Sequence, residues 1–236
     1  MGLAFRHELK YIINEREKDI LERQLILAAE KDPNAQKKGT GSYFIRSLYF
    51  DDRHHRSYNE KIDGVDVRAK YRIRIYDMQD KLIRLEKKEK VGSYIRKTEA
   101  LLSREEAECL SRGDPFIIAD RSEPLLREFY ILCLTEMMRP EVMVDYTRVP
   151  YVYDLGTVRI TFDMHLRAGY PGSLFDSGMP SYEAMEPGQL ILEVKYTELL
   201  PEIFREVLQP MAGSYTAASK FILCVDKKRE YRGISV

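Results

Sequence analysis

The sequence predicts an α+β fold, in which a curved antiparallel sheet or an antiparallel β-barrel has helices packed around it. Three observations support this. Many segments alternate apolar and charged residues with a period of two, as strands do. Helix-start signals recur between these segments. No internal repeat or domain linker interrupts the pattern, so we expect the whole chain, 1–236, to form a single domain.

The chain begins with a strand followed by a helix. Residues 4–13 alternate as a strand, and Asn14 with Glu17 is a capping-box signature that starts an amphipathic helix over 15–30. The next elements are expected to be a polar loop, a strand and a short helix, at 31–41, 43–51 and 54–62.

A β-hairpin with one strongly charged face is the most informative segment. Charged residues occupy alternate positions along 68–76 and again along 81–90, and apolar residues occupy most positions between them. Residues 77–80 supply the turn. One face of the hairpin therefore carries Arg68, Lys70, Arg72, Arg74, Arg84, Glu86, Lys88 and Lys90.

The rest of the chain is read from the same signals. A strand near 93–102 ends at Ser103, which with Glu106 forms a second capping box and starts a helix over 104–111. Later helices are expected at 123–138, 201–209 and 214–226, although the apolar run of the last segment also suits a strand. Later strands are expected at 140–153, 157–168 and 190–198. Residues 169–189 are rich in Gly, Pro and Ser and are expected to form a long loop that lines or covers a site.

Composition excludes several function classes. The 38 Lys and Arg balance the 38 Asp and Glu, which argues against a general nucleic-acid-binding protein. No apolar run is long enough to span a membrane, and the first residues lack the apolar segment of a signal peptide. The three cysteines, at unrelated spacings, are typical of reduced thiols. We therefore expect a soluble cytoplasmic protein.

Charged faces recur on five predicted strands, which is more than a solvated sheet face requires. If the sheet closes, these faces line a wet lumen, where unpaired ions cost several kcal/mol each. A polyphosphate or a nucleoside triphosphate would offset that cost through charge-assisted hydrogen bonds. Carboxylates among the cations, at Glu8, Glu86 and Glu193, suit a hard divalent ion that bridges protein and phosphate oxygens.

Six motifs, in this order, resemble one known family. They are FRHELKYII at the start, SLYFDD (47–52), the hairpin YRIRIY…RLEKKEK, VRITFD (158–163), LILEVKY (190–196) and SKFILC (219–224). This set resembles the VTC domain, the polyphosphate-polymerase module of the vacuolar transporter chaperone complex and its stand-alone bacterial relatives. That family belongs to the CYTH-like triphosphate tunnel metalloenzymes. One departure is Arg6, which stands where the wider superfamily has the first Glu of its ExExK signature.

The resemblance implies an antiparallel β-barrel whose tunnel holds a triphosphate and Mn²⁺ or Mg²⁺. It implies transfer of the γ-phosphoryl group of ATP onto inorganic polyphosphate. The implied catalytic cations are Arg72, Arg74, Lys88, Arg148 and Arg159. The implied phosphate-binding residues are Lys10, Lys97, Tyr146, Ser219 and Lys220, with Glu193 as metal ligand. Glu8 and Glu86 are added to the predicted metal site because they are carboxylates among the cations.

Two other functions remain open on the sequence. The first is hydrolysis of inorganic triphosphate or of a nucleoside triphosphate in the same tunnel. The second is a non-catalytic module that binds polyphosphate, or a nucleotide, in a complex with a membrane-protein partner. An intact metal carboxylate together with an intact basic lining favours an enzyme over a binding module.

Overall fold

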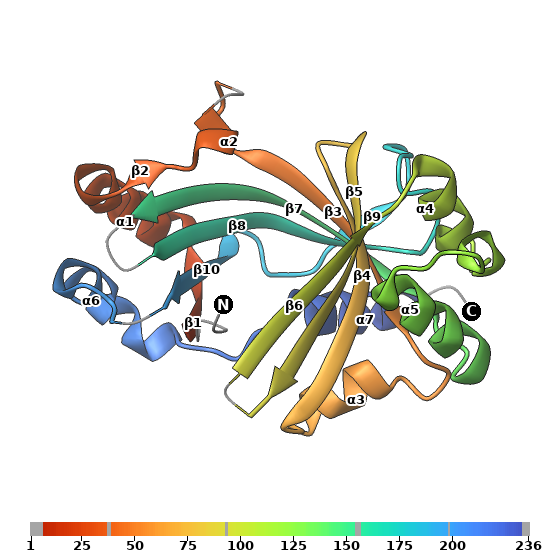
Figure 1. The fold of residues 1–236 in the computed structure, drawn as a ribbon. Coiled ribbons are helices and arrows are strands. Elements are labelled where there is room, and N and C mark those ends of the chain that lie inside the picture. Colours follow the sequence, from red (N-terminus) through yellow and green to blue (C-terminus); the bar gives the residue numbers. More distant parts are fainter. Residues whose placement is uncertain (1–6, 37–38, 93, 154–156, 198, 233–236) are drawn as a thin grey trace. The chain divides into compact units, whose positions relative to one another are not determined.

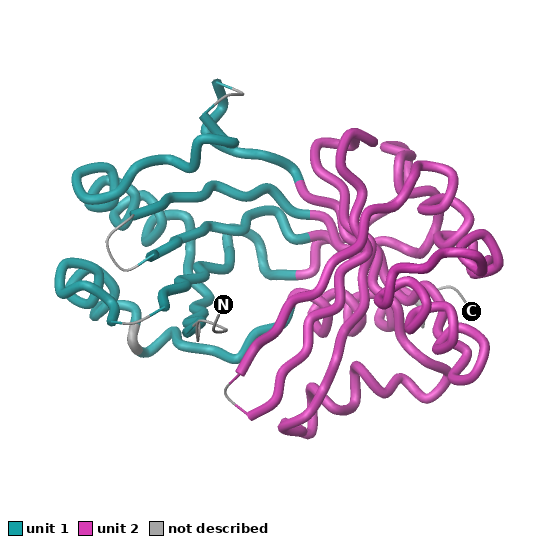
Figure 2. The backbone as a smooth tube through the Cα atoms, viewed as in Figure 1, with its two compact units in different colours: residues 1–44, 146–166, 185–219 teal, residues 45–145, 167–184, 220–236 magenta. Residues whose placement is uncertain are grey.

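The computed structural model describes residues 7–36, 39–92, 94–153, 157–197 and 199–232 (Figure 1). The chain divides into two compact units, and each is made of separate stretches of sequence (Figure 2). Unit 1 comprises 1–44, 146–166 and 185–219. Unit 2 comprises 45–145, 167–184 and 220–236.

Unit 1 contains strands and helices from both ends of the chain. Its strands are β1 (His7–Asn14), β2 (Glu30–Lys31) and β10 (Gln189–Tyr196). Its helices are α1 (Glu15–Ala28), α2 (Pro33–Gln36), α6 (Glu202–Leu208) and the 3-10 helix η2 (Gln209–Ser214). It shares with unit 2 the strands β3 (Tyr43–Asp51), β7 (Arg139–Tyr153) and β8 (Val158–Gly169).

Unit 2 is built on the predicted hairpin. Its strands are β4 (Val67–Tyr76), β5 (Gln79–Val91), β6 (Tyr94–Leu101) and β9 (Ser181–Glu183). Its helices are α3 (Arg56–Ile62), α4 (Arg104–Ser111), the 3-10 helix η1 (Phe116–Ile118), α5 (Pro124–Thr135) and α7 (Lys220–Arg232). In the described residues the strands form an antiparallel sheet in the order β1-β10-β8-β7-β3-β4-β5-β6, with β2 beside β7 and β9 beside β8.

In unit 1 the helices cover one face of the strands. Leu21 and Leu25 of α1 and Phe204 of α6 are buried in one apolar cluster with Phe162 of β8 and Leu192 of β10. Because alternate strand residues point to opposite faces, Thr161 and Glu193, next along their strands, lie on the other face. Burial of the apolar face thus fixes the pairing register of the strands, and this register places the charged residues together on the opposite face.

Unit 2 repeats this arrangement with different helices. Ile73 of β4 and Leu85 of β5 are fully buried with residues of α4 and α5. Phe129 of α5 lies edge-on to Phe50 at 4.9 Å and packs against Tyr71 at 5.6 Å between ring centres. The opposite face of β4 and β5 carries the basic side chains.

Most predicted elements are confirmed, including both capping boxes. The Asn14 side chain accepts from the backbone of Glu17, and Ser103 does the same for Glu106. Strand 43–51 and helix 104–111 have the predicted ends. Within the described residues, none of the helices has the length and hydropathy needed to span a membrane.

The predicted helix over 214–226 is wrong at its start, because α7 begins at Lys220. The backbone N–H of Thr216 donates to the carbonyl of Lys10 at 2.9 Å, and Tyr215 forms a β-bridge with Tyr11. The segment before Lys220 therefore pairs with β1 rather than coiling. Smaller differences are an α1 that ends at Ala28, β2 where the predicted helix 15–30 meets the predicted loop 31–41, and α2 within that loop. In addition, β9 lies within 169–189, and α5 ends at Thr135.

Replacing Phe129 with Ala tests the core of unit 2. Phe129 is fully buried between two aromatic rings, so we expect Phe129→Ala to lower the free energy of unfolding by about 3–5 kcal/mol. Urea unfolding, monitored by circular dichroism, measures this change in the free energy of unfolding. Phe116→Ala, at an exposed ring, is the matched control and should cost under about 1 kcal/mol. Equal losses in the two variants would contradict this packing.

Candidate functional site

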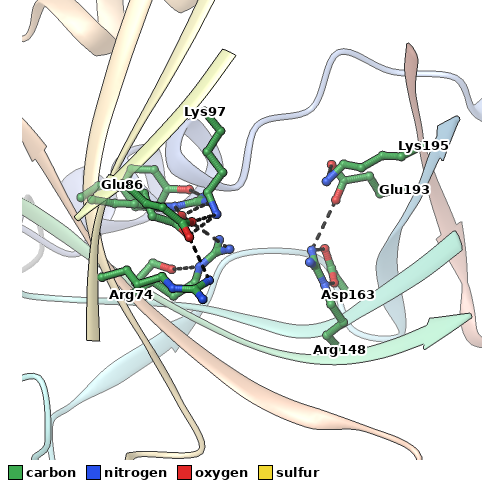
Figure 3. Close-up of polar contacts among 12 residues, drawn as sticks. Arg74, Glu86, Lys97, Arg148, Asp163, Glu193 and Lys195 are labelled. Atoms are coloured by element: carbon green, nitrogen blue, oxygen red, sulfur yellow. Dashed lines mark hydrogen bonds and ion pairs between the residues drawn. The ribbon is translucent and has the colours of Figure 1, made fainter. Parts of the chain in front are cut away.

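Each unit holds one cluster of charged side chains, on the strand face opposite α1 and α6 in unit 1 and opposite α4 and α5 in unit 2 (Figure 3). In unit 2 the cluster comes from β4, β5 and β6 and is centred on Glu86. In unit 1 it comes from β1, β7, β8 and β10 and is centred on Arg148 and Glu193. The two clusters are described separately.

In unit 2, three cations share the carboxylate of Glu86. Arg72 Nη2 lies 2.6 Å from Oε2, and Lys97 Nζ lies 2.6 Å from Oε1. Arg74 Nη1 lies 3.7 Å from Oε2. Burial would raise the pKa of Glu86, but Arg72, Arg74 and Lys97 outweigh burial and hold it far below its ordinary 4.5. The carboxylate is ionised and holds the cations in place, yet it balances only part of their charge.

Two hydroxyl groups of β3 complete this cluster. Tyr49 OH accepts a hydrogen bond from Arg72 Nη1 at 2.6 Å, and Ser47 Oγ accepts from Arg74 Nε at 3.2 Å. Tyr49 is buried, which alone would raise its pKa; Arg72, Arg74 and Lys220 outweigh burial and lower it. The cations around Tyr49 therefore outweigh the cost of burying its anion, and such an excess of positive charge attracts anions.

In unit 1, Arg148 forms a buried pair with Asp163. Arg148 Nε and Nη2 donate to the two oxygens of Asp163 at 2.6 and 2.8 Å, and Nη2 also donates to Glu193 Oε2 at 3.3 Å. Burial opposes the charge of Arg148, but Asp163, Tyr146 and Glu193 raise its pKa well above the ordinary value. The guanidinium lies 5.4 Å from the ring centre of Tyr146. These contacts fix Arg148 and one oxygen of Glu193.

Glu193 and Glu8 lie around the ammonium group of Lys195. Lys195 Nζ is 3.2 Å from Glu193 Oε1 and 3.9 Å from Glu8 Oε1. Lys10, opposite Glu193 in the β1–β10 register, has its Nζ 3.5 Å from Glu8 Oε1. A cation is therefore already held between two carboxylates.

These residues fit a divalent cation that phosphate oxygens help to bind. Lys195 serves as a stand-in cation between Glu8 and Glu193. Thr161 lies opposite Glu193 on β8, and its buried hydroxyl has no hydrogen-bond partner among the described residues. No three acidic, His or Cys side chains in the described part of the chain converge on one point, so phosphate or water would supply the other ligands.

The other predicted site residues differ in how closely they join a cluster. Lys88 is opposite Lys97 in the β5–β6 register, and Lys220 is close enough to affect Tyr49. Arg159 lies on the charged face of β8, but its guanidinium contacts Asp32 at 3.0 Å and Tyr43 OH at 3.1 Å. Ser219 directly precedes α7.

Several residues of the two clusters were not among the predicted site residues. They are the hydroxyl residues Ser47, Tyr49 and Thr161, the acid Asp163 and the cation Lys195. Asp163 and Lys195 are visible in the alternation of their strands. Ser47 and Tyr49 lie on a strand without a charged pattern, so only the pairing of β3 with β4 reveals them.

A protein-family model named VTC domain matches residues 5–227. This chain belongs to the VTC domain family. No curated protein sequence matches it. Two solved structures have a similar fold. One, from Bacillus halodurans, is provisionally named an adenylate cyclase; it is 14% identical, with a TM-score of 0.55 over 93% of this chain and 96% of that chain.

The second similar structure comes from Hippeastrum. That protein is provisionally named an adenylyl cyclase and is described as having a dominant triphosphatase activity. It is 14% identical, with a TM-score of 0.52 over 94% of this chain and 96% of that chain. These likenesses show the fold alone. The fold they share with this chain agrees with the α+β class that the sequence predicts, an antiparallel sheet with helices packed on it.

The buried pair of the VTC domain gives a stability prediction. Replacing Asp163 with Asn leaves Arg148 charged and buried, and we expect a loss of about 3–5 kcal/mol in unfolding free energy. Asp80→Asn is the control, since Asp80 pairs with Arg104 at the surface and should cost under about 1 kcal/mol. Chemical denaturation compares them, and similar losses would contradict a structural role for the buried pair.

Glu86 gives a pH prediction. Its pKa is lowered in the folded state, so its stabilising contribution is present above about 4.5 and is lost as pH falls through the folded value. The unfolding free energies of wild type and Glu86→Gln should therefore differ by a constant amount near neutral pH and converge in acid. Denaturation at several pH values tests this, with the exposed Glu183→Gln as control. A difference that does not change with pH would contradict it.

Proposed function

We propose that this VTC domain is a metal-dependent phosphotransferase that moves the γ-phosphoryl group of ATP onto inorganic polyphosphate. The observation that carries the proposal is the arrangement of Arg72, Arg74 and Lys97 around the single buried carboxylate of Glu86. Cations in excess of the carboxylate between them favour an anion with many acceptor oxygens.

In unit 2, Arg72, Arg74 and Lys97 are proposed to bind phosphate oxygens. Glu86 holds these three cations in place before substrate arrives, so little side-chain entropy is lost on binding. The sequence predicts Glu86 as a further carboxylate for the metal, but a metal ion there would have to displace at least one of these cations. Lys88 and Lys220 add positive charge to the same cluster.

In unit 1, Glu193 and Glu8 are proposed to hold Mn²⁺ or Mg²⁺. When bound, the metal ion would neutralise phosphate oxygens and assist departure of the diphosphate. Arg148 orients Glu193 through one oxygen, and Asp163 keeps Arg148 in that position. Lys10, Arg159, Tyr146 and Ser219 remain proposed phosphate-binding residues.

The proposed reaction needs no nucleophile from the protein. The acceptor is the terminal phosphate of the chain, which is already an oxyanion. Burial raises the pKa of Cys133 to about 12 and that of Cys224 well above its usual range, so neither thiol is an activated nucleophile. The residues of the two clusters position phosphates and neutralise charge.

Incubation of the purified protein with ATP and Mn²⁺, followed by gel staining for polyphosphate, tests the function. Wild type should produce polymer, and Arg74→Ala and Glu193→Gln should reduce its rate by about 10²-fold or more, since each removes charge at the reacting phosphates. As controls, Arg104→Ala removes a guanidinium group and Glu183→Gln removes a carboxylate, both from ion pairs at the surface. These two variants should leave the rate unchanged.

The other outcomes separate the alternatives. Release of phosphate without polymer would replace the polymerase with a triphosphate hydrolase. No turnover, combined with heat stabilisation by triphosphate that Arg74→Ala abolishes, would indicate a binding module. Loss of activity in the two surface controls would contradict the assignment to the clusters.

A further inference from the structure

Helix α5 of unit 2 carries apolar side chains both toward the core and toward solvent. Leu125, Phe129 and Cys133 are buried in the apolar core of the unit. Ile131 and Leu134 lie on the opposite side of the helix and are 53% and 48% exposed. A helix that is apolar on all sides is ordinarily covered on all sides. The outward side of α5, at the surface of unit 2, therefore has the composition of a covered surface (Figure 1).

Another helix of the same unit, α4, shows the pattern of a helix that faces water. Its exposed positions begin with the charged residues Arg104 and Glu105. The outward stripe of α5 instead runs from Arg127 through Ile131 to Leu134, at positions i, i+4 and i+7. Exposure to water alone thus does not account for the apolar stripe, because this unit places charges on the exposed positions of α4.

The 3-10 helix η1 widens the apolar stripe. Phe116 is 66% exposed and lies edge-on to Tyr130 of α5, with 6.2 Å between the ring centres. Aromatic residues and arginine are enriched in protein interfaces and lysine is depleted there, and residues 98–194 contain no lysine. The residues named here form a surface that we call the α5 patch: Phe116, Ile117, Arg127, Tyr130, Ile131 and Leu134.

Charges at the two ends of α5 favour a second copy of this chain as the partner of the patch. Arg127, near the start of the helix, forms no ion pair within the described ranges. Glu136 directly follows the helix and lies 3.4 Å from the exposed Arg56. Two α5 helices that pack antiparallel would bring each Arg127 to Glu136 of the second copy, with Ile131 near the two-fold axis. Parallel packing would place Arg127 against Arg127.

A membrane surface fits the patch less well than a second copy does. Helices that bind membrane surfaces carry mainly Lys and Arg around their apolar side. Here acidic groups border the patch: Asp114 accepts a hydrogen bond from the backbone N–H of Phe116 at 3.0 Å, and Glu136 lies at the end of α5. Acids and arginines in one surface can instead complement each other across a two-fold axis.

We propose that the α5 patch is the contact surface of a two-fold symmetric homodimer in which the α5 helices of two copies pack antiparallel. Ile131 and Leu134 of each copy would contact apolar side chains of the other. Interfaces of standard size bury about 800 Å² on each partner, and six residues supply only part of that area. We therefore expect a weak dimer, with a Kd on the order of 10 µM. The proposal does not depend on the reaction proposed above.

Analytical ultracentrifugation at protein concentrations from about 1 to 200 µM tests the dimer. Wild type should pass from monomer to dimer as its concentration rises. Ile131→Glu and Leu134→Glu would each bury a carboxylate at the contact and should weaken association at least about tenfold. Leu27→Glu is the matched control, since Leu27 of α1 is 88% exposed and lies outside the patch, and it should associate as wild type does.

Exchange of the two end charges tests the antiparallel arrangement. Arg127→Glu and Glu136→Arg each place like charges opposite one another across the dimer and should weaken association about fivefold. The double variant Arg127→Glu/Glu136→Arg restores an attractive pair and should recover most of the association. Circular dichroism should show the wild-type helix content in every variant, because each substitution is at the surface. Recovery in the double variant distinguishes a contact between copies from local damage to α5.

A wild type that stays monomeric over the whole range would overturn the proposal. Equal weakening by Leu27→Glu and Ile131→Glu would do so too, as would a double variant no better than the single charge variants. Co-sedimentation of a monomeric wild type with anionic phospholipid vesicles, lost in Ile131→Glu, would assign the α5 patch to a membrane surface and reject the dimer.

Discussion

A β-strand can give only one of its faces to an apolar core, and in this chain that constraint decides where the charge lies. Phe162 and Leu192 are fully buried beneath the helices of unit 1, which leaves Thr161, Asp163 and Glu193 on the other face. In unit 2, burial of Ile73 and Leu85 similarly directs their neighbours Arg72 and Glu86 away from α5. A slip of one residue in either register would bury the charges and expose the core, so the cost of that slip maintains both clusters.

The two clusters use their carboxylates differently. Asp163 gives both oxygens to one arginine, so that pair is nearly neutral and its function is to position Arg148. Glu86 is shared among Arg72, Arg74 and Lys97, which leaves a positive surplus. The lowered pKa of Tyr49 is a consequence of that surplus. One cluster is thus organised to hold a fixed geometry, and the other carries an excess of positive charge.

Local signals predicted the elements, and long-range pairing accounts for what they missed. Ser103 with Glu106 fixes the start of α4 because the cap involves residues three apart in sequence. The start of α7 could not be found in this way, because the hydrogen bond from Thr216 to Lys10 joins residues far apart in the chain. The same holds in the sites: Arg72 and Arg74 follow from alternation, whereas Tyr49 and Ser47 are placed by the pairing of β3 with β4. Hydroxyl side chains are uncharged, so an alternation of charged residues along a strand does not indicate them.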